Sequence, residues 1–174
     1  VPFRLSQHLD RLFHSAEKLA LLLRHDRDAI THAADELVRA SGLAEGRMRI
    51  TVTRGPIDAD DDPEAIRSTL LVTLGPTAGF APEVYATGIS AAIAAMRVNP
   101  ADLMAGHKTL AYWPRLLTLQ AARLKGAGEA IWFTLDGRLA EGCISNVFLA
   151  KDGKLITPPV DTPILPGVTR GAVL

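Results

Sequence analysis

Two short segments carry residue types that can do covalent and acid–base chemistry. Residues 106–113 place Lys108 among apolar and aromatic neighbours, where desolvation would favour the neutral amine, the nucleophile of Schiff-base chemistry. Residues 139–148 place Glu141 at the end of a predicted strand, followed by small residues and Asn146, which suits a tight turn beside a ligand. Taken singly, the two segments also fit an exposed surface lysine and a turn with a solvated glutamate.

Two further segments could bind an anion. Residues 164–170 contain a Pro-Gly turn that leads into a predicted helix, whose free backbone N–H groups and dipole favour a phosphate. Arg11 lies on the first predicted helix and could bind an anion through two parallel hydrogen bonds. Each of these also fits a simple helix start and a solvated helix arginine.

The first half of the chain predicts two helices and two strands. Apolar residues at three- and four-residue steps predict helices over Ser6–Leu23, with its first residue as the N-cap, and over residues 28–40. Alternating β-branched residues predict strands over residues 49–53 and 69–74. The Gly- and Pro-rich residues 75–82 predict a linker.

The second half has a different pattern. Residues 84–97 fit either a helix or two short strands, and residues 114–125 predict a helix with proline at its first turn. Short strands separated by Asp-Gly pairs, which favour hairpins, are predicted over residues 129–135, 139–141, 146–150 and 154–157.

Composition excludes several classes of protein. The 174 residues carry 19 Lys and Arg against 19 Asp and Glu, so nothing indicates the basic face of a nucleic-acid binder. The longest apolar run, Ile89–Met96, is far shorter than the about 20 residues of a membrane span. The single cysteine, Cys143, is predicted to be a packing residue, and the lack of a possible internal disulfide fits a cytoplasmic protein. The chain begins at Val1 and ends at Leu174 within a predicted helix, so we expect both ends to be truncated.

No metal site is predicted. The acidic residues between Asp58 and Glu64 lack the central glycine and distal glutamate of a calcium loop, so a solvated loop is expected. The five histidines show no spacing typical of metal ligands.

Taken together, the order and spacing of the four segments resemble the fold-type IV pyridoxal-phosphate (PLP) enzymes. This family contains the branched-chain aminotransferases, the D-amino-acid aminotransferases and the aminodeoxychorismate lyases. The resemblance extends from Phe3 to the C-terminus and is strongest over residues 105–170. Residues 141–148, 155–159 and 165–170 look like the family signature, nearly unbroken.

The resemblance implies a role for each matching residue. Lys108 matches the lysine that forms a Schiff base with PLP and then moves the α-proton, and Glu141 matches the carboxylate that pairs with the pyridine nitrogen. Leu165 matches the residue that packs on a face of the ring. Tyr112 matches a tyrosine near the phenolic oxygen of the ring, although Ala111 stands where many members have asparagine.

The anion-binding roles follow in the same way. Arg11, Val168 and Thr169 match the phosphate cradle of the family. Arg49 aligns with an arginine on the substrate side of the branched-chain enzymes, and is the candidate for binding the substrate carboxylate.

The resemblance also implies a fold and a reaction. We expect an α/β protein with a small N-terminal α/β domain (residues 1–77) and a larger mixed-sheet or barrel-like domain (residues 78–174), with PLP in the cleft between them. The resemblance favours strand over residues 84–97, and it implies a homodimer.

The expected reaction is transfer of an amino group between an L-amino acid, with branched-chain amino acids as the candidate class, and a 2-keto acid. The segment after Thr53-Arg54-Gly55 lacks the arginine of the D-specific enzymes. Residues 99–108 resemble a run found in the lyases, so aminodeoxychorismate lyase is the alternative. A PLP-binding or interaction protein without catalysis is a further one.

Overall fold

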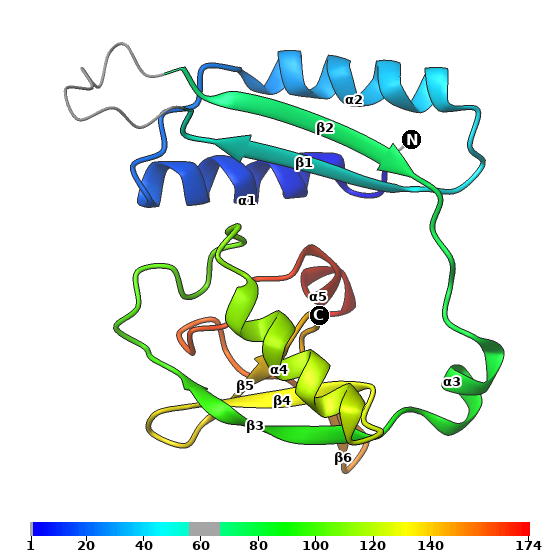
Figure 1. The fold of residues 1–174 in the computed structure, drawn as a ribbon, viewed down its shortest axis with the longest axis vertical. Coiled ribbons are helices and arrows are strands. Elements are labelled where there is room, and N and C mark those ends of the chain that lie inside the picture. The colour runs from blue at the N-terminus through cyan, green and yellow to red at the C-terminus, as the bar shows by residue number, and fades with distance from the viewer. Residues whose placement is uncertain (1, 56–66) are drawn as a thin grey trace. The chain divides into compact units, whose positions relative to one another are not determined.

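The computed structural model describes residues 2–55 and 67–174. The chain forms two compact units, residues 1–79 and residues 80–174, and each contains its own β-structure (Figure 1). The acidic loop predicted over residues 58–64 lies outside the described residues. Within the described residues, no helix combines the length and the apolar character needed to cross a membrane.

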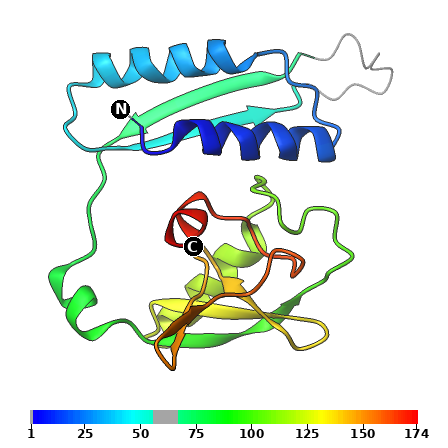
Figure 2. The ribbon, with the colours of Figure 1, turned by 180° about the vertical axis from the view of Figure 1, so that it is seen from behind.

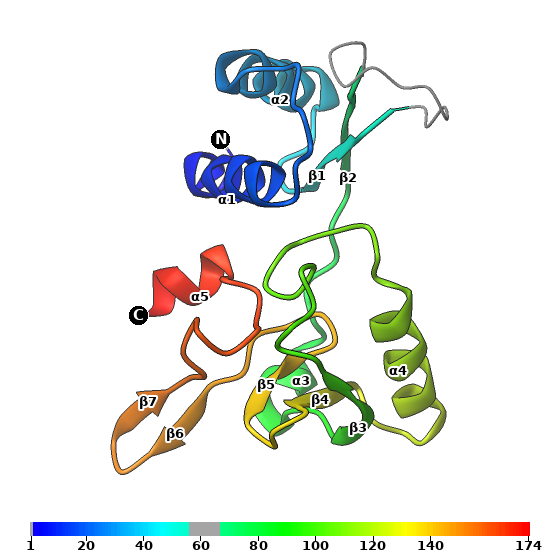
Figure 3. The ribbon, with the colours of Figure 1, turned by 90° about the vertical axis from the view of Figure 1, so that its left-hand side faces the viewer.

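The first unit pairs two helices with a β-hairpin. Helices α1 (Leu5–Lys18) and α2 (Arg27–Ser41) precede the antiparallel strands β1 (Arg47–Thr53) and β2 (Thr69–Gly75). Both helices lie on one face of this hairpin (Figure 3). Since a two-stranded ribbon alone is marginally stable in water, the apolar faces of the helices are needed to hold it.

Helix α2 begins and ends at residues that suit those positions. The side chain of Asp26 accepts a hydrogen bond from the backbone N–H of Ala29 at 2.7 Å, which satisfies one of the free donors of the first turn. Gly42 follows the last turn with a φ of 63°, a left-handed conformation that glycine adopts without steric cost.

Helix α1 differs from the sequence prediction at both ends. Ser6 lies inside the helix, and the residue at the N-cap is Arg4, which has a left-handed backbone. The helix ends at Lys18 rather than at Leu23, because Ala20 adopts a φ of 52° and turns the chain away. The apolar spacing continues past the helix, so periodicity alone could not show where it stops.

The second unit is built on a three-stranded mixed sheet. Its strands are β3 (Ala91–Val98), β4 (Glu129–Thr134) and β5 (Leu139–Gly142), in the order β3-β4-β5. Strands β3 and β4 are parallel and are joined through helix α4 (Trp113–Leu124), whereas β4 and β5 are antiparallel neighbours. The unit is therefore mixed α/β, as predicted.

A second hairpin and a short helix complete this unit. Strands β6 (Leu149–Lys151) and β7 (Lys154–Ile156) are joined through Asp152 and Gly153, which both have positive φ, as the Asp-Gly pair predicted. Helix α5 (Val168–Val173) follows. Figure 3 shows α4 and the β6–β7 hairpin on opposite sides of the three-stranded sheet, and Figure 2 shows the segment from β6 to α5 from behind.

Two strand predictions need correction. Residues 84–87 are not strand but belong to the short helix α3 (Pro82–Thr87), whose proline at the start presets a helical φ; strand begins only at Ala91. Strand β6 begins at Leu149 rather than at Asn146, because the side chain of Asn146 is engaged in tertiary hydrogen bonds.

The core of the second unit lies between α4 and the sheet. It consists mostly of alanine and other small side chains around Trp132, which is 4% exposed. The indole N–H of Trp132 donates to Sγ of Cys143 at 3.2 Å. Burial is the main reason that the pKa of the Cys143 thiol is raised, so this cysteine is a packing residue, as predicted, rather than a reactive one.

The cap of α2 leads to a stability prediction. Asp26→Ala should lower the free energy of unfolding by about 1 kcal/mol, because the Ala29 N–H loses its acceptor. Asp26→Asn should cost little, because asparagine caps about as well. Urea unfolding followed by circular dichroism measures both, and equal losses in the two variants would contradict the capping role.

Candidate active site

Four of the residues singled out from the sequence line one cavity of the second unit. Lys108, Tyr112, Glu141 and Leu165 are among the lining residues of a cavity of about 270 Å³. They come from the β3–α4 connection, from strand β5 and from the segment before α5. Residues up to 57 positions apart in the sequence, as Lys108 and Leu165 are, therefore share one space.

Lys108 is presented by the long connection between β3 and α4. The side chains of Asn99 and Asp102 each accept a hydrogen bond from the backbone N–H two residues further on, at 3.0 and 2.9 Å. These local turns hold a segment that has no regular secondary structure. Its lysine places Nζ 5.3 Å from the centroid of the Tyr112 ring, which brings the amine beside an aromatic face in the same cavity.

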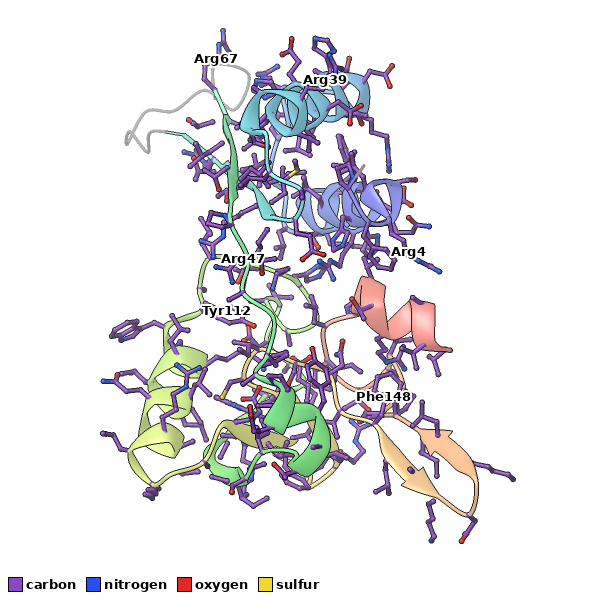
Figure 4. All side chains as sticks on the ribbon, turned by 90° about the vertical axis from the view of Figure 1, so that its right-hand side faces the viewer. Arg4, Arg39, Arg47, Arg67, Tyr112 and Phe148 are labelled. Atoms are coloured by element: carbon purple, nitrogen blue, oxygen red, sulfur yellow. The ribbon has the colours of Figure 1, made fainter. Side chains whose placement is uncertain are left out.

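Tyr112 lies immediately before α4 (Figure 4). Its hydroxyl donates to the backbone oxygen of Cys143 at 2.9 Å. Burial is the largest cause of the raised pKa of this phenol, and the positive charge of Arg115 opposes it. The hydroxyl is therefore protonated at neutral pH, with its proton directed to Cys143, and its oxygen can still accept a hydrogen bond.

Glu141 is a buried carboxylate that receives three hydrogen bonds. It is 5% exposed. Its Oε1 accepts from Arg115 at 2.6 Å, while Oε2 accepts from the backbone N–H of Leu165 at 3.0 Å and from the amide of Asn146 at 3.3 Å. The donors come from three separate segments, so the position of this carboxylate is set by the tertiary structure.

Burial still dominates the protonation of Glu141. Desolvation raises the pKa of its carboxyl group above the ordinary 4.5, and the charge of Arg115 is the strongest of the opposing effects. The Leu165 N–H and the charge of Lys108 also oppose it. The carboxylate is thus held in a place where its charge depends on its neighbours.

Arg115 was not singled out from the sequence. It lies in the first turn of α4 and donates both to Glu141 and, at 2.9 Å, to the backbone oxygen of Gly142. Its guanidinium lies over the ring of Trp132, 5.2 Å from the centroid. The only available signal in the sequence was its position three residues after Tyr112, which places both side chains on the same face at the start of the helix. That spacing does not indicate which residue Arg115 would bind.

Glu129 is a second buried carboxylate that the sequence did not reveal. It lies at the start of β4 and is 8% exposed. Its oxygens accept from the backbone N–H of Cys143 at 3.0 Å and from the hydroxyl of Ser145 at 2.8 Å. Glu129 thereby holds the turn that follows Glu141.

Asn146 connects this turn to the segment before α5. Its amide donates to the backbone oxygen of Leu165 at 2.9 Å as well as to Glu141. Gly167 lies against it, because a Cβ atom built on this glycine would come 2.1 Å from Oδ1 of Asn146. Leu165 is consequently tied to the turn at both its N–H and its carbonyl group.

The remaining predicted residues are not among those lining this cavity. Val168 and Thr169 form the first turn of α5, where Val168 is buried and Thr169 is exposed. Arg11 and Arg49 belong to the first unit. Arg11 donates to Nδ1 of His8 at 3.4 Å on α1, and Arg49 is exposed on β1 opposite Thr73.

Comparison with known proteins identifies the family to which this chain belongs. The model of the family described as amino-transferase class IV matches residues 1–174. The chain therefore belongs to the class IV aminotransferases, and the resemblance seen in the sequence is confirmed. Enzymes of this family depend on PLP.

Among its relatives is the branched-chain-amino-acid aminotransferase of Escherichia coli K12, which is 30% identical over 181 residues. The alignment covers 100% of this chain and 58% of that enzyme. A crystal structure of the Escherichia coli enzyme matches with a TM-score of 0.91 at 27% identity, over 98% of this chain and 58% of that one. The chain thus spans a little under three fifths of the length of this relative.

Two further solved structures show how broad the likeness is. The PLP form of a branched-chain aminotransferase from Thermobaculum terrenum matches with a TM-score of 0.84 at 26% identity, over 98% of this chain and 56% of that one. The 4-amino-4-deoxychorismate lyase of Pseudomonas aeruginosa matches with a TM-score of 0.79 at 25% identity, over 99% and 63%. The fold is therefore similar to that of both transaminases and lyases.

The contact between Gly167 and Asn146 gives a testable prediction. Gly167→Ala should displace Asn146 and lower the free energy of unfolding by about 1–3 kcal/mol, the usual cost of overpacking. Gly171→Ala, inside helix α5 that follows Gly167, is the control, since a Cβ there meets nothing within 4 Å and alanine favours a helix. Thermal or urea unfolding measures both, and equal effects would show that Asn146 is not under this constraint.

The raised pKa of Glu141 gives a prediction for the pH dependence of stability. The folded protein binds this proton more tightly than the unfolded chain. Lowering the pH through the folded-state pKa should therefore stabilise the wild type relative to Glu141→Gln, and the gain should level off near pH 4.5, where the unfolded group also takes its proton. Urea unfolding of both PLP-free proteins between about pH 8 and 4.5 tests this, and a difference that shrinks with acidification would contradict it.

Proposed function

We propose that this chain is the cofactor-holding part of a PLP-dependent aminotransferase that moves an amino group between an L-amino acid and a 2-keto acid. The observation that carries the proposal is that an amine, Lys108, and a deeply buried carboxylate, Glu141, line one cavity. Membership of the class IV aminotransferases supports it. Branched-chain amino acids are the candidate substrates, because the relatives named above include branched-chain enzymes.

The residues of the cavity fit a pyridine ring. A carboxylate oxygen can accept about two hydrogen bonds, so Oε1 of Glu141, which accepts from Arg115, has capacity for a ring N–H. Leu165 offers an apolar side chain on the same cavity wall, held in place through its backbone. The carboxylate acceptor of the cavity therefore suits a protonated aromatic nitrogen, and the amine beside it can bind an aldehyde.

Each residue would have a definite task. When bound, PLP supplies an electron sink for the electrons released at the substrate α-carbon. Nζ of Lys108 would hold the aldehyde carbon of the cofactor and would afterwards accept and return the α-proton. Glu141 would accept from the ring N–H, and Tyr112 would lie near the ring oxygen.

The tasks of four residues rest on the resemblance and on their chemistry. We propose that Val168 and Thr169, through the first turn of α5, and the guanidinium of Arg11 bind the phosphate. Arg49 is proposed for the substrate carboxylate. The domains 1–77 and 78–174 with PLP in the cleft between them, the homodimer and the cytoplasmic location are parts of the same proposal.

The central test is the chemistry of Lys108. Purified protein with added PLP should absorb visible light, and borohydride reduction should fix the cofactor to Lys108, as located by mass spectrometry of the peptides. Lys108→Ala should lower turnover by at least about 100-fold, because acid–base catalysis alone contributes that much. Lys125→Ala, at the exposed end of α4, is the control and should behave as the wild type.

Turnover assays separate the three candidate functions. Conversion of an amino acid that requires a 2-keto acid supports transamination. Release of products from aminodeoxychorismate without a keto acid would instead identify a lyase. This alternative is retained because the fold is similar to that of the Pseudomonas aeruginosa lyase. Cofactor bound at Lys108 without any turnover would identify a binding protein, and reduction that labels other lysines would overturn the proposal.

A further inference from the structure

Arg115 is fixed on three sides around the carboxylate of Glu141. One nitrogen donates to Oε1 of Glu141 at 2.6 Å, and the other donates to the backbone oxygen of Gly142 at 2.9 Å. The face of the guanidinium lies over Trp132, a core residue. The arginine side chain is 21% exposed and the glutamate side chain 7%, so water screens this ion pair much less than a surface pair.

The surroundings of Glu141 explain why this arginine matters. The hydrogen bonds from Leu165 and Asn146 orient Oε2 but bring no formal charge. Among the described residues, the other titratable groups that line the cavity of Glu141 are Lys108, Tyr112, Arg97, Asp102 and His107. Glu129 and Cys143 do not line it, but both act on Tyr112. Lys108 is itself the proposed reacting amine, whereas Arg115 takes no part in the covalent chemistry and keeps its charge throughout.

We propose that Arg115 is a positioning residue of the cofactor site, whose fixed guanidinium keeps Glu141 charged and oriented as the acceptor for the ring N–H. The proposal rests on the proposed function, since it assigns Glu141 to the pyridine nitrogen. It adds a residue that acts through Glu141 and need not touch the cofactor. The competing explanation is purely structural: Arg115 would only pack α4 against Trp132 and the end of β5.

The two explanations differ in where a proton resides. The charge of Arg115 holds the pKa of Glu141 below the value that burial alone would give. More of the PLP-free sites are therefore ionised with Arg115 present, and these sites must take up a proton for the ring nitrogen when PLP binds. Without the guanidinium, burial raises the pKa of Glu141 further, so more of the PLP-free sites already carry that proton. A structural role would change stability but would leave the proton count unchanged.

The experiment measures this count in the purified protein. Calorimetric titration with PLP in buffers of different ionisation enthalpy gives the number of protons taken up at each site. Arg115→Gln should take up fewer protons than the wild type, with about one proton as the largest possible difference. Arg115→Lys, which keeps the positive charge, should restore the wild-type uptake, and Arg123→Gln, an exposed position on the same helix, should not change it.

A second readout does not need the cofactor. In PLP-free protein, the free energy of unfolding of Arg115→Gln should rise more steeply on acidification from about pH 8 to 5 than that of the wild type, because Glu141 takes its proton at a higher pH. The extra slope should vanish in the double variant Arg115→Gln/Glu141→Gln. If the single variant does not fold but the double variant does, the cause is the buried carboxyl group of Glu141 without its guanidinium partner, which supports the proposal.

Several outcomes would overturn it. Wild-type proton uptake and a wild-type pH profile in Arg115→Gln would show that Arg115 only packs, and so would failure of both the single and the double variant to fold. Failure of the wild type to bind PLP would overturn the proposed function and the role assigned here toward the ring nitrogen. The unfolding experiment would then still show whether Arg115 sets the charge of Glu141, which keeps the two failures distinguishable.

Discussion

The second unit depends on one constraint, the burial of a carboxylate. Removing a charged group from water is costly unless it is paired and hydrogen-bonded. Glu141 meets this condition through Arg115, Leu165 and Asn146. The start of α4, the end of β5 and the segment before α5 must therefore lie together, because each supplies part of what the carboxylate needs.

The same constraint explains why so much of the surrounding structure is polar. Glu129 holds the turn that follows Glu141 by accepting hydrogen bonds from the backbone N–H of Cys143 and from the hydroxyl of Ser145. The small residue Gly142 allows these groups to approach, since a Cβ there would come 2.3 Å from Oγ of Ser145. A buried polar network of this kind stabilises one arrangement when all its members are satisfied.

The arrangement around Glu141 belongs to a chain of the class IV aminotransferase family. The family depends on PLP, and one cavity of this chain is lined by the amine of Lys108 and by the buried carboxylate of Glu141. The fold is shared by transaminases and a lyase, so the fold does not choose the reaction. The choice among these chemistries lies in side chains that meet the substrate.

The sequence by itself determined the family, the cofactor and the mixed α/β class, and it singled out Lys108 and Glu141 as candidates, because signature motifs and local periodicity are properties of neighbouring residues. The sequence placed the end of α1 too late and the start of strand β3 too early. The positive φ of Ala20 and the start of helix α3 both lie within apolar runs, where they leave little trace in the pattern. Only the tertiary structure showed that Arg115 pairs with Glu141 and that Glu129 holds the turn after it. Their partners lie 26 and 14–16 residues away, and such pairings are set by packing and burial, which no local pattern records.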